Sequence, residues 1–156
     1  MIEEARRALA ATKLFNSLPE SHLTRLAAFT GLEAVARGKH VFREGDPGDR
    51  FYLILEGRIR ISRQLPGMGE EALAILEPGD YFGEMALIDG RPRSADALAH
   101  ESAKLLTLNK RDLDDLLFVD KIVAYDILWA FVRTLSSRLR ETDNKLTFLS
   151  VSSKFG

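Results

Sequence analysis

Hydrophobic residues recur at three- and four-residue spacings near the start of the chain. Within residues 1–37 the residues that follow this spacing are Leu9, Leu14, Phe15, Leu18, Leu23, Leu26, Ala27 and Phe29. Such spacing places side chains on one face of an α-helix. Pro19 suits a first helical turn, and Gly31 suits a helix end. The pattern therefore predicts helices over residues 1–37.

Glycine and proline divide the middle of the chain, residues 38–109, into short stretches that favour strands. The stretches between these turn residues that are apolar enough to be strands are 40–45, 50–57, 58–65, 71–79 and 104–109. Ile59 and Ile61 alternate with polar residues, as they do on a strand with one buried face. Many short strands separated by turns predict a β-roll, a jelly-roll-like antiparallel β-sandwich. With helices on both sides of it, the fold class is α+β.

The helical pattern returns over residues 110–149. Asn109 is a candidate cap for a first short helix, and a longer helix without glycine or proline starts near Asp120. Along it, residues that step alternately by four and three are Leu128, Val132, Leu135, Leu139, Thr142, Leu146 and Leu149. This heptad repeat favours a parallel homodimer through the long helix, although the same stripe could pack on the chain's own β-roll. Residues 150–156 are predicted to be a frayed tail of what we interpret as one domain.

Composition and charge exclude several functional classes. There is no cysteine, and His22, His40 and His100 show no ligand spacing, so we expect no metal and no cofactor. Nucleotide-triphosphatase, serine-hydrolase and metalloprotease motifs are absent, which argues against an enzyme. A net charge of −1 argues against nucleic-acid binding. The chain lacks both a membrane-spanning apolar run and a secretory signal, so we expect a cytoplasmic protein without membrane contact.

The stretch FGEMALIDGRPRSADA, residues 82–97, carries the most specific polar chemistry. Glu84 follows a glycine, and Arg93 lies nine residues later beside the small Ser94 and Ala95. An arginine fork binds phosphate oxygens, and the first N–H groups of a short helix at GEMALI would point at an anion. A carboxylate fits there if it accepts a hydrogen bond from a sugar hydroxyl. These requirements indicate a 3′,5′-cyclic nucleotide, although the spacing alone fits a surface salt bridge between Glu84 and Arg93 at least as well.

A longer segment, GDYFGEMALIDGRPRSADA, resembles the phosphate-binding cassette of the cyclic nucleotide-binding domain family. The shared pattern is F-G-E-apolar-A-L, a short loop, and then P-R-S-A. LFNSLPESHLTRL resembles the leading helix of that family, and VFREGDPGDRFYLILEGRIRI resembles its first strands. The resemblance covers residues 13–145, and it implies that residues 81–97 are the cassette.

The resemblance implies a role for each matching residue. Glu84 would accept a hydrogen bond from the ribose 2′-hydroxyl, Arg93 would pair with the phosphate, and Ser94 would donate to the phosphate or the purine. The other residues expected in the binding site are Phe82, Gly83, Met85, Ala86 and Ala95 of the cassette and Ile61 and Leu73 of the strands. The last two would form apolar walls around the base, or they are ordinary core residues.

The resemblance also implies that the long C-terminal helix is a lid and a dimer seam. Thr142, the polar residue of the heptad stripe, would meet the purine, or it is a tolerated polar seam residue. Arg138 and Arg140 are the alternative lid residues. Ser94 leaves the choice between cAMP and cGMP open, and the likeness to bacterial members favours cAMP.

The implied function is a two-state sensor switched by the ligand. Its output would lie in a partner protein or in a further part of a longer chain. The alternative is a degenerate member of the family that keeps the fold as a scaffold for dimerisation and protein contacts and has lost the ligand.

Overall fold

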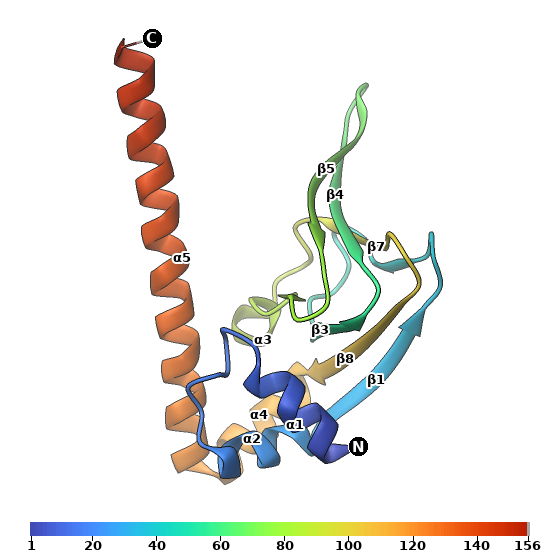
Figure 1. Cartoon of the computed structure of the whole chain (residues 1–156), viewed down its shortest axis with the longest axis vertical. Helices are drawn as coiled ribbons and strands as arrows, with labels where there is room; N and C mark the ends of the chain where they lie inside the picture. The colour runs from blue at the N-terminus through green and yellow to red at the C-terminus, as the bar shows by residue number, and fades with distance from the viewer. Residues whose placement is uncertain (156) are drawn as a thin grey trace.

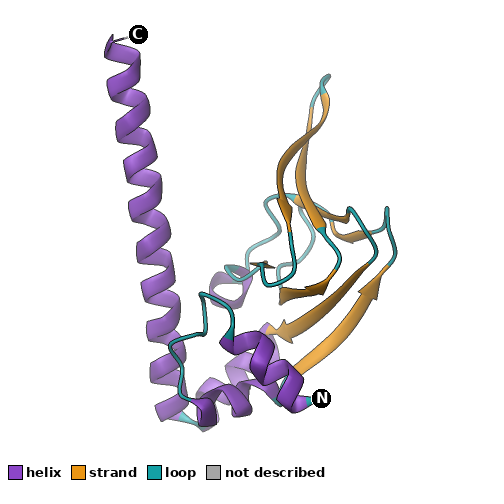
Figure 2. Cartoon of the chain, viewed as in Figure 1, coloured by secondary structure: helices purple, strands orange, loops and turns teal. Residues whose placement is uncertain are grey.

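Two antiparallel sheets form the centre of the computed structural model, which describes residues 1–155. Their strand orders are β1-β8-β3-β6 and β2-β7-β4-β5. The strands are β1 (Thr30–Val35), β2 (His40–Phe42), β3 (Arg50–Glu56), β4 (Ile59–Leu65), β5 (Gly69–Leu76), β6 (Tyr81–Phe82), β7 (Asp96–Ala99) and β8 (Ala103–Asn109). The predicted α+β fold with a β-roll is confirmed (Figure 2).

Helices from both ends of the chain gather beside one end of this roll (Figure 1). They are α1 (Ile2–Ala10), α2 (Glu20–Ala27), α4 (Lys110–Val119) and the start of α5 (Lys121–Phe155), whereas α3 (Ala86–Asp89) lies within the cassette. At 1.5 Å per residue, α5 is roughly 50 Å long, and Figure 1 shows its far half standing clear of the roll. None of the helices in the described part of the chain combines the length and hydropathy that a membrane span requires.

The N-terminal segment is less helical than the sequence pattern predicts. Residues 30–35 form β1, which pairs with β8 from Thr30 opposite Leu108 to Val35 opposite Ala103. The apolar spacing that predicted a helix up to residue 37 is too short there to distinguish helix from strand. The deciding contact is with β8, whose paired residues lie 68 to 78 positions later in the chain. The predicted range of N-terminal helices is therefore wrong beyond Ala27, and Leu14, Phe15 and Leu18 lie in the connection between α1 and α2 rather than in a helix.

Three further elements differ from the predictions. The segments Tyr81–Phe82 and Asp96–Ala99, which are not among the predicted strands, form β6 beside β3 and β7 between β2 and β4. At the other end, α5 continues through Phe155, so the predicted tail from residue 150 is wrong for the described residues. No glycine or proline interrupts residues 121–155, and serine is only mildly unfavourable in a helix.

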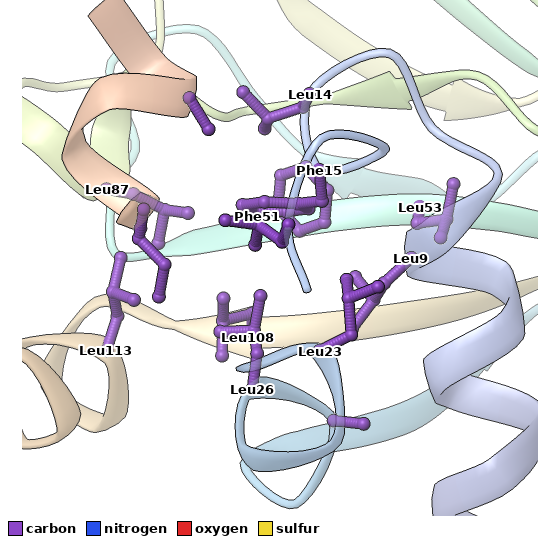
Figure 3. Packing of buried hydrophobic residues seen from close by; sticks show 14 of the residues in the cluster. Leu9, Leu14, Phe15, Leu23, Leu26, Phe51, Leu53, Leu87, Leu108 and Leu113 are labelled. Carbon is purple, nitrogen blue, oxygen red and sulfur yellow. The ribbon is translucent and has the colours of Figure 1, made fainter. Parts of the chain in front are cut away.

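Aromatic packing fixes the base of α5 on the roll. The ring of Phe15, in the connection between α1 and α2, lies edge-on to Phe51 of β3 at 5.9 Å and to Phe131 of α5 at 6.0 Å between ring centroids. Figure 3 shows Phe15 and Phe51 at the centre of the buried cluster, with Leu26 and Leu108 close to them. Three distant parts of the sequence therefore meet at Phe15.

Polar contacts add to this attachment of α5. Arg25 of α2 pairs with Asp120, and His22 Nδ1 lies 2.8 Å from Asp126 Oδ2. The Asp120 carboxylate also accepts hydrogen bonds from the backbone N–H groups of Ile122 and Val123, so it caps the start of α5. The first third of α5 is thus held by α2 and by the connection between α1 and α2.

The heptad stripe of α5 does not pack on the chain's own roll. Its exposed members are Leu128, Val132, Leu139, Thr142, Leu146 and Leu149, and Leu135 is partly exposed. The buried residues of the helix lie on another face, at Val123, Ala124, Ile127, Ala130 and Phe131. The alternative that the stripe covers the β-roll is therefore wrong. The homodimer stays a prediction.

We predict that Phe15→Ala lowers the free energy of unfolding by about 3–5 kcal/mol, because it removes a fully buried ring at the junction of three elements. Phe118→Ala is the matched control, since the Phe118 side chain is 77% exposed, and we expect it to cost less than about 0.5 kcal/mol. Urea unfolding measures both. Equal losses in the two variants would contradict this account of the core.

Candidate functional site

A cavity of about 420 Å³ opens where the cassette faces α5. Its lining includes most of the residues that the sequence places in the site, namely Ile61, Phe82, Gly83, Glu84, Met85, Ala86, Arg93, Ser94 and Ala95. Further lining residues come from β2, β6, the end of α3, the loop after it and α5, namely Phe42, Tyr81, Asp89, Arg91, Pro92 and Arg138. The fold therefore brings the cassette, an apolar strand position and one residue of the long helix to the same hollow.

The backbone of the cassette makes a compact turn around this cavity. After β6, Gly83 adopts a φ of +77°, and the single turn of α3 ends at Gly90 in the left-handed conformation. A Cβ atom on Gly83 would lie 2.6 Å from Arg93 Nη1 and 2.9 Å from the carbonyl oxygen of Arg50. Only glycine fits there, because both the φ angle and the approach of Arg93 exclude a side chain.

Arg93 is a buried cation without a carboxylate partner. Its side chain forms no ion pair with any described Asp or Glu, and its Nε–H has no hydrogen-bond partner there. Instead Nη2 donates to the carbonyl oxygen of Arg50 at 2.6 Å, and the guanidinium lies 4.2 Å from the centroid of the Phe42 ring. Burial lowers the pKa of Arg93 from its usual range, but a guanidinium remains protonated at neutral pH.

Glu84 pairs with α5 and not with Arg93. Its carboxylate is buried and forms an ion pair with Arg138, 54 residues later in the sequence. Partial burial by itself would lower the pKa of Arg138, but the Glu84 carboxylate outweighs this effect and the pKa is raised. The Arg138 guanidinium also lies 5.4 Å from the centroid of the Tyr81 ring. The alternative of a surface salt bridge between Glu84 and Arg93 is therefore wrong.

The remaining predicted residues lie outside this hollow. Leu73, on β5, is half exposed and does not line the cavity. Thr142 is exposed one turn beyond Arg138, and its hydroxyl donates to the Arg138 carbonyl oxygen at 3.0 Å. Arg140 is also exposed and away from the lining. Contacts of Leu73 and Thr142 with a ligand stay predictions, whereas the structure places Arg138 at the cavity.

Sequence reasoning missed the aromatic part of the site. Phe42 lies beneath Arg93, and the ring of Tyr52 stacks on Phe82 with 5.0 Å between their centroids. Phe42 and Tyr52 lie in predicted strands, where an aromatic residue reads as ordinary core. No local pattern in the sequence indicates that their rings support the arginine, because the contact depends on how β2, β3 and β6 meet.

A larger open groove of about 690 Å³ shares Tyr81 and Arg138 with the first cavity. It runs between α5 and the connection from α1 to α2, and its charged lining mixes Lys13 and Arg133 with Asp80 and Glu141. It holds no buried cation comparable to Arg93. The smaller cavity is therefore the better candidate site, because the Arg93 guanidinium in its lining has no anionic partner among the described residues.

The groups that line the cavity suit the binding of an anion. It offers a buried guanidinium that lacks an anion, a carboxylate at its edge, and apolar walls from Ile61 and Phe82. Across the described residues, no group of three or more histidine, aspartate or glutamate side chains is arranged to hold a metal ion. A small molecule with one negative charge and one hydroxyl group matches these features.

Comparisons with known proteins agree with this geometry. A model of the cyclic nucleotide-binding domain family matches residues 32–120. The chain is 34% identical over 142 residues to the cyclic AMP receptor protein of Thermus thermophilus, which covers 91% of this chain and 64% of that protein. It is 28% identical over 144 residues to mouse cGMP-dependent protein kinase 2, which covers 92% of this chain and 18% of the kinase.

A solved structure has a fold similar to that of this chain. The N-terminal domain of a transcriptional regulator from Streptomyces coelicolor A3(2) superposes with a TM-score of 0.78 and 37% sequence identity, over 89% of this chain and 94% of that chain. The present chain spans less than two thirds of the length of the first curated relatives it matches.

We predict that Gly83→Ala lowers the free energy of unfolding by about 1–3 kcal/mol more than Gly67→Ala, because only the first side chain collides with buried groups. Both glycines have a similar positive φ, but a Cβ on Gly67 meets no atom within 4 Å. The control therefore isolates the collision from the cost of the φ angle. Equal losses in urea unfolding would show that the cassette does not close tightly on Arg93.

Proposed function

The chain belongs to the cyclic nucleotide-binding domain family, and from that premise we propose that it is a regulatory sensor that binds a cyclic mononucleotide, with cAMP favoured over cGMP. The ligand occupies the cavity lined by the cassette. The observation that carries this proposal is the buried Arg93 guanidinium, which has no carboxylate partner among the described residues. A ligand phosphate supplies the missing anion.

Arg93 suits a phosphate diester. A single negative charge balances one guanidinium, and the unpaired Nε–H leaves a donor for a phosphate oxygen. The neutral partners of Arg93, two carbonyl groups and an aromatic ring, hold the guanidinium without neutralising it. Charge-assisted hydrogen bonds in such a water-poor setting are stronger than neutral ones.

Glu84 and Arg138 connect ligand binding to α5. The ribose 2′-hydroxyl donates to the Glu84 carboxylate, which in the present structure is paired with Arg138. A ligand that contacts Glu84 therefore changes the environment of a residue on the long helix. Such a ligand shifts the position of α5 only by the difference between its affinities for the two positions. Arg138 is the lid residue in this proposal.

The preference for cAMP rests on the relatives and not on the pocket. Cyclic AMP is named in the Thermus thermophilus and Mycobacterium tuberculosis relatives, which match over 90% or more of this chain. Of the kinase relatives whose names contain cGMP, that of mouse is 28% identical over 92% of this chain and that of Drosophila melanogaster is 38% identical over 70% of it. Ser94 lines the cavity but suits either purine. Ile61 is a wall of the base pocket, and a contact between Thr142 and the purine would require α5 to approach the cavity more closely.

The exposed heptad stripe supports a parallel homodimer through α5. It presents large apolar side chains on a face of the helix that no part of the described chain covers. Because Arg138 lies on the same helix, a dimer seam links the two binding sites.

The output of the switch lies in a protein partner or in a further part of a longer chain. A scaffold that had lost its ligand would have no need to retain a buried cation.

We predict that the protein binds cAMP in calorimetric titration and that Arg93→Ala weakens binding by about 3 kcal/mol, or roughly 100-fold, because the phosphate loses its charged partner. Glu84→Ala should cost less, about 1 kcal/mol, since one hydrogen bond is lost. Arg58→Ala is the control, because Arg58 is paired with Glu101 outside the cavity. Absence of heat with both cAMP and cGMP, from folded protein free of nucleotide, would favour the ligand-free scaffold.

We further predict that the protein sediments as a dimer and that Leu139→Glu converts it to a monomer, because the substitution places a charge on the apolar seam. Asn144→Glu adds the same charge to an exposed position of α5 outside the seam, and it should remain a dimer. Sedimentation equilibrium measures all three proteins. A monomeric parent, or equal behaviour of the two variants, would remove the seam from the proposal.

A further inference from the structure

Arg93 is held largely by a single stretch of chain, the connection from β2 to β3. The Arg93 N–H donates to the Asp46 carbonyl oxygen at 2.8 Å, and the Gly45 N–H donates to the Arg93 carbonyl oxygen at 2.9 Å. The carbonyl oxygen of Arg50, at the end of this connection, accepts from Nη2 of the guanidinium. Phe42, at its beginning, lies beneath the guanidinium. The position of Arg93 therefore depends on where this connection lies.

The backbone ladder that places the connection is interrupted beside the cassette. β2 pairs with β7 at His40 opposite Leu98 and at Phe42 opposite Ala97, with an irregularity between them. Two residues later, the Glu44 N–H donates to the side chain of Asp96, whose Oδ1 lies 2.6 Å away. Backbone pairing resumes at Gly45 and Arg93. The Asp96 carboxylate thus takes the place of a backbone carbonyl in the gap.

Asp96 is well placed to fix the connection and badly placed to touch a ligand. It is the first residue of β7, it is only 7% exposed, and it lies opposite the buried Ser62 of β4. It is not part of the cavity lining, although it follows the lining residues Ser94 and Ala95. A buried acceptor that takes up one backbone N–H is costly to remove, because that N–H is then left without a partner.

We propose that Asp96 is a positioning residue for anion binding. Its carboxylate holds the connection from β2 to β3, and the connection holds Arg93 in the orientation that a phosphate requires. The proposal rests on the proposed function for its ligand. It assigns to Asp96 no contact with the nucleotide, so its effect on binding passes through Arg93.

Two variants separate the acceptor from the rest of the side chain. Asp96→Leu is similar in size but cannot accept a hydrogen bond, whereas Asp96→Asn keeps the oxygen atom that Glu44 requires. Amide hydrogen exchange, followed by NMR without ligand, reports the placement of the connection directly. In the leucine variant we expect the Gly45 and Arg93 amides to exchange at least about tenfold faster, because local opening becomes easier. Amides of the β1–β8 pair should not change, and the asparagine variant should match the parent.

Titration with cAMP then tests the consequence for binding. We expect about tenfold weaker affinity for Asp96→Leu and parental affinity for Asp96→Asn, because a small displacement of a binding group strongly reduces affinity. The same leucine substitution in an Arg93→Lys background should have a clearly smaller effect on affinity, because two residues that act through one contact are not additive. A general loss of stability would not show this dependence on Arg93.

Several results would overturn the proposal. One is parental exchange and parental affinity in Asp96→Leu, and another is faster exchange of the two amides with unchanged affinity. An asparagine variant as weak as the leucine variant would show that the acceptor is not what matters. If the leucine variant does not fold, rapid exchange of the Glu44 amide in the parent would itself contradict the hydrogen bond. Failure of the parent to bind either nucleotide would instead overturn the proposed function, and the exchange data would still decide whether Asp96 places the connection.

Discussion

The buried guanidinium of Arg93 is the constraint on which the rest of the site depends. Burying a charge without an opposite charge costs several kcal/mol in a protein interior. The chain reduces this cost with the carbonyl groups of Arg50 and Gly83 and with the ring of Phe42, and no carboxylate among the described residues forms an ion pair with Arg93. These partners keep the guanidinium in place and leave its charge unbalanced. The site is therefore prepared for an anion from outside.

The long helix α5 connects the binding cavity to a surface outside it. Its base is fixed by Phe131 against Phe15 and by charged contacts with α2, while its second half has no partner in the described chain. Arg138 lies between these two parts and pairs with Glu84 at the edge of the cavity. A rigid element that touches both the binding site and an exposed apolar seam is suited to couple the two. The coupling is part of the proposed function.

Much of the fold and of the cassette was predictable because the signals are local. Gly83, Glu84 and Arg93 with their small neighbours form a dense pattern, and glycine and proline mark most of the short strands. The strand over Thr30–Val35 was missed because its identity depends on pairing with β8 and not on its own spacing. The end of α5 was placed too early because chain ends commonly fray, whereas this helix continues through Phe155.

The partners of the two central charges could not be predicted for a similar reason. Glu84 pairs with Arg138 only because α5 packs alongside the cassette. From the sequence, Arg138 was one of several candidate lid residues. Phe42 supports Arg93 only because β2 runs beside β7. In the sequence Asp96 is only a polar residue at the end of the cassette motif. In the folded chain its carboxylate accepts the Glu44 N–H, where the backbone pairing of β2 is interrupted. Each of these contacts joins segments whose proximity is created by the sheets.

The most direct test of the central claim is the ¹⁵Nε–¹Hε NMR signal of Arg93 during titration with cAMP. The signal is assigned by its absence in an Arg93→Lys variant. If the unpaired Nε–H donates to a phosphate oxygen, this signal moves downfield and its exchange with solvent slows as the nucleotide saturates the protein. A signal that stays unchanged while cAMP binds would show that the anion is held elsewhere and would contradict the account.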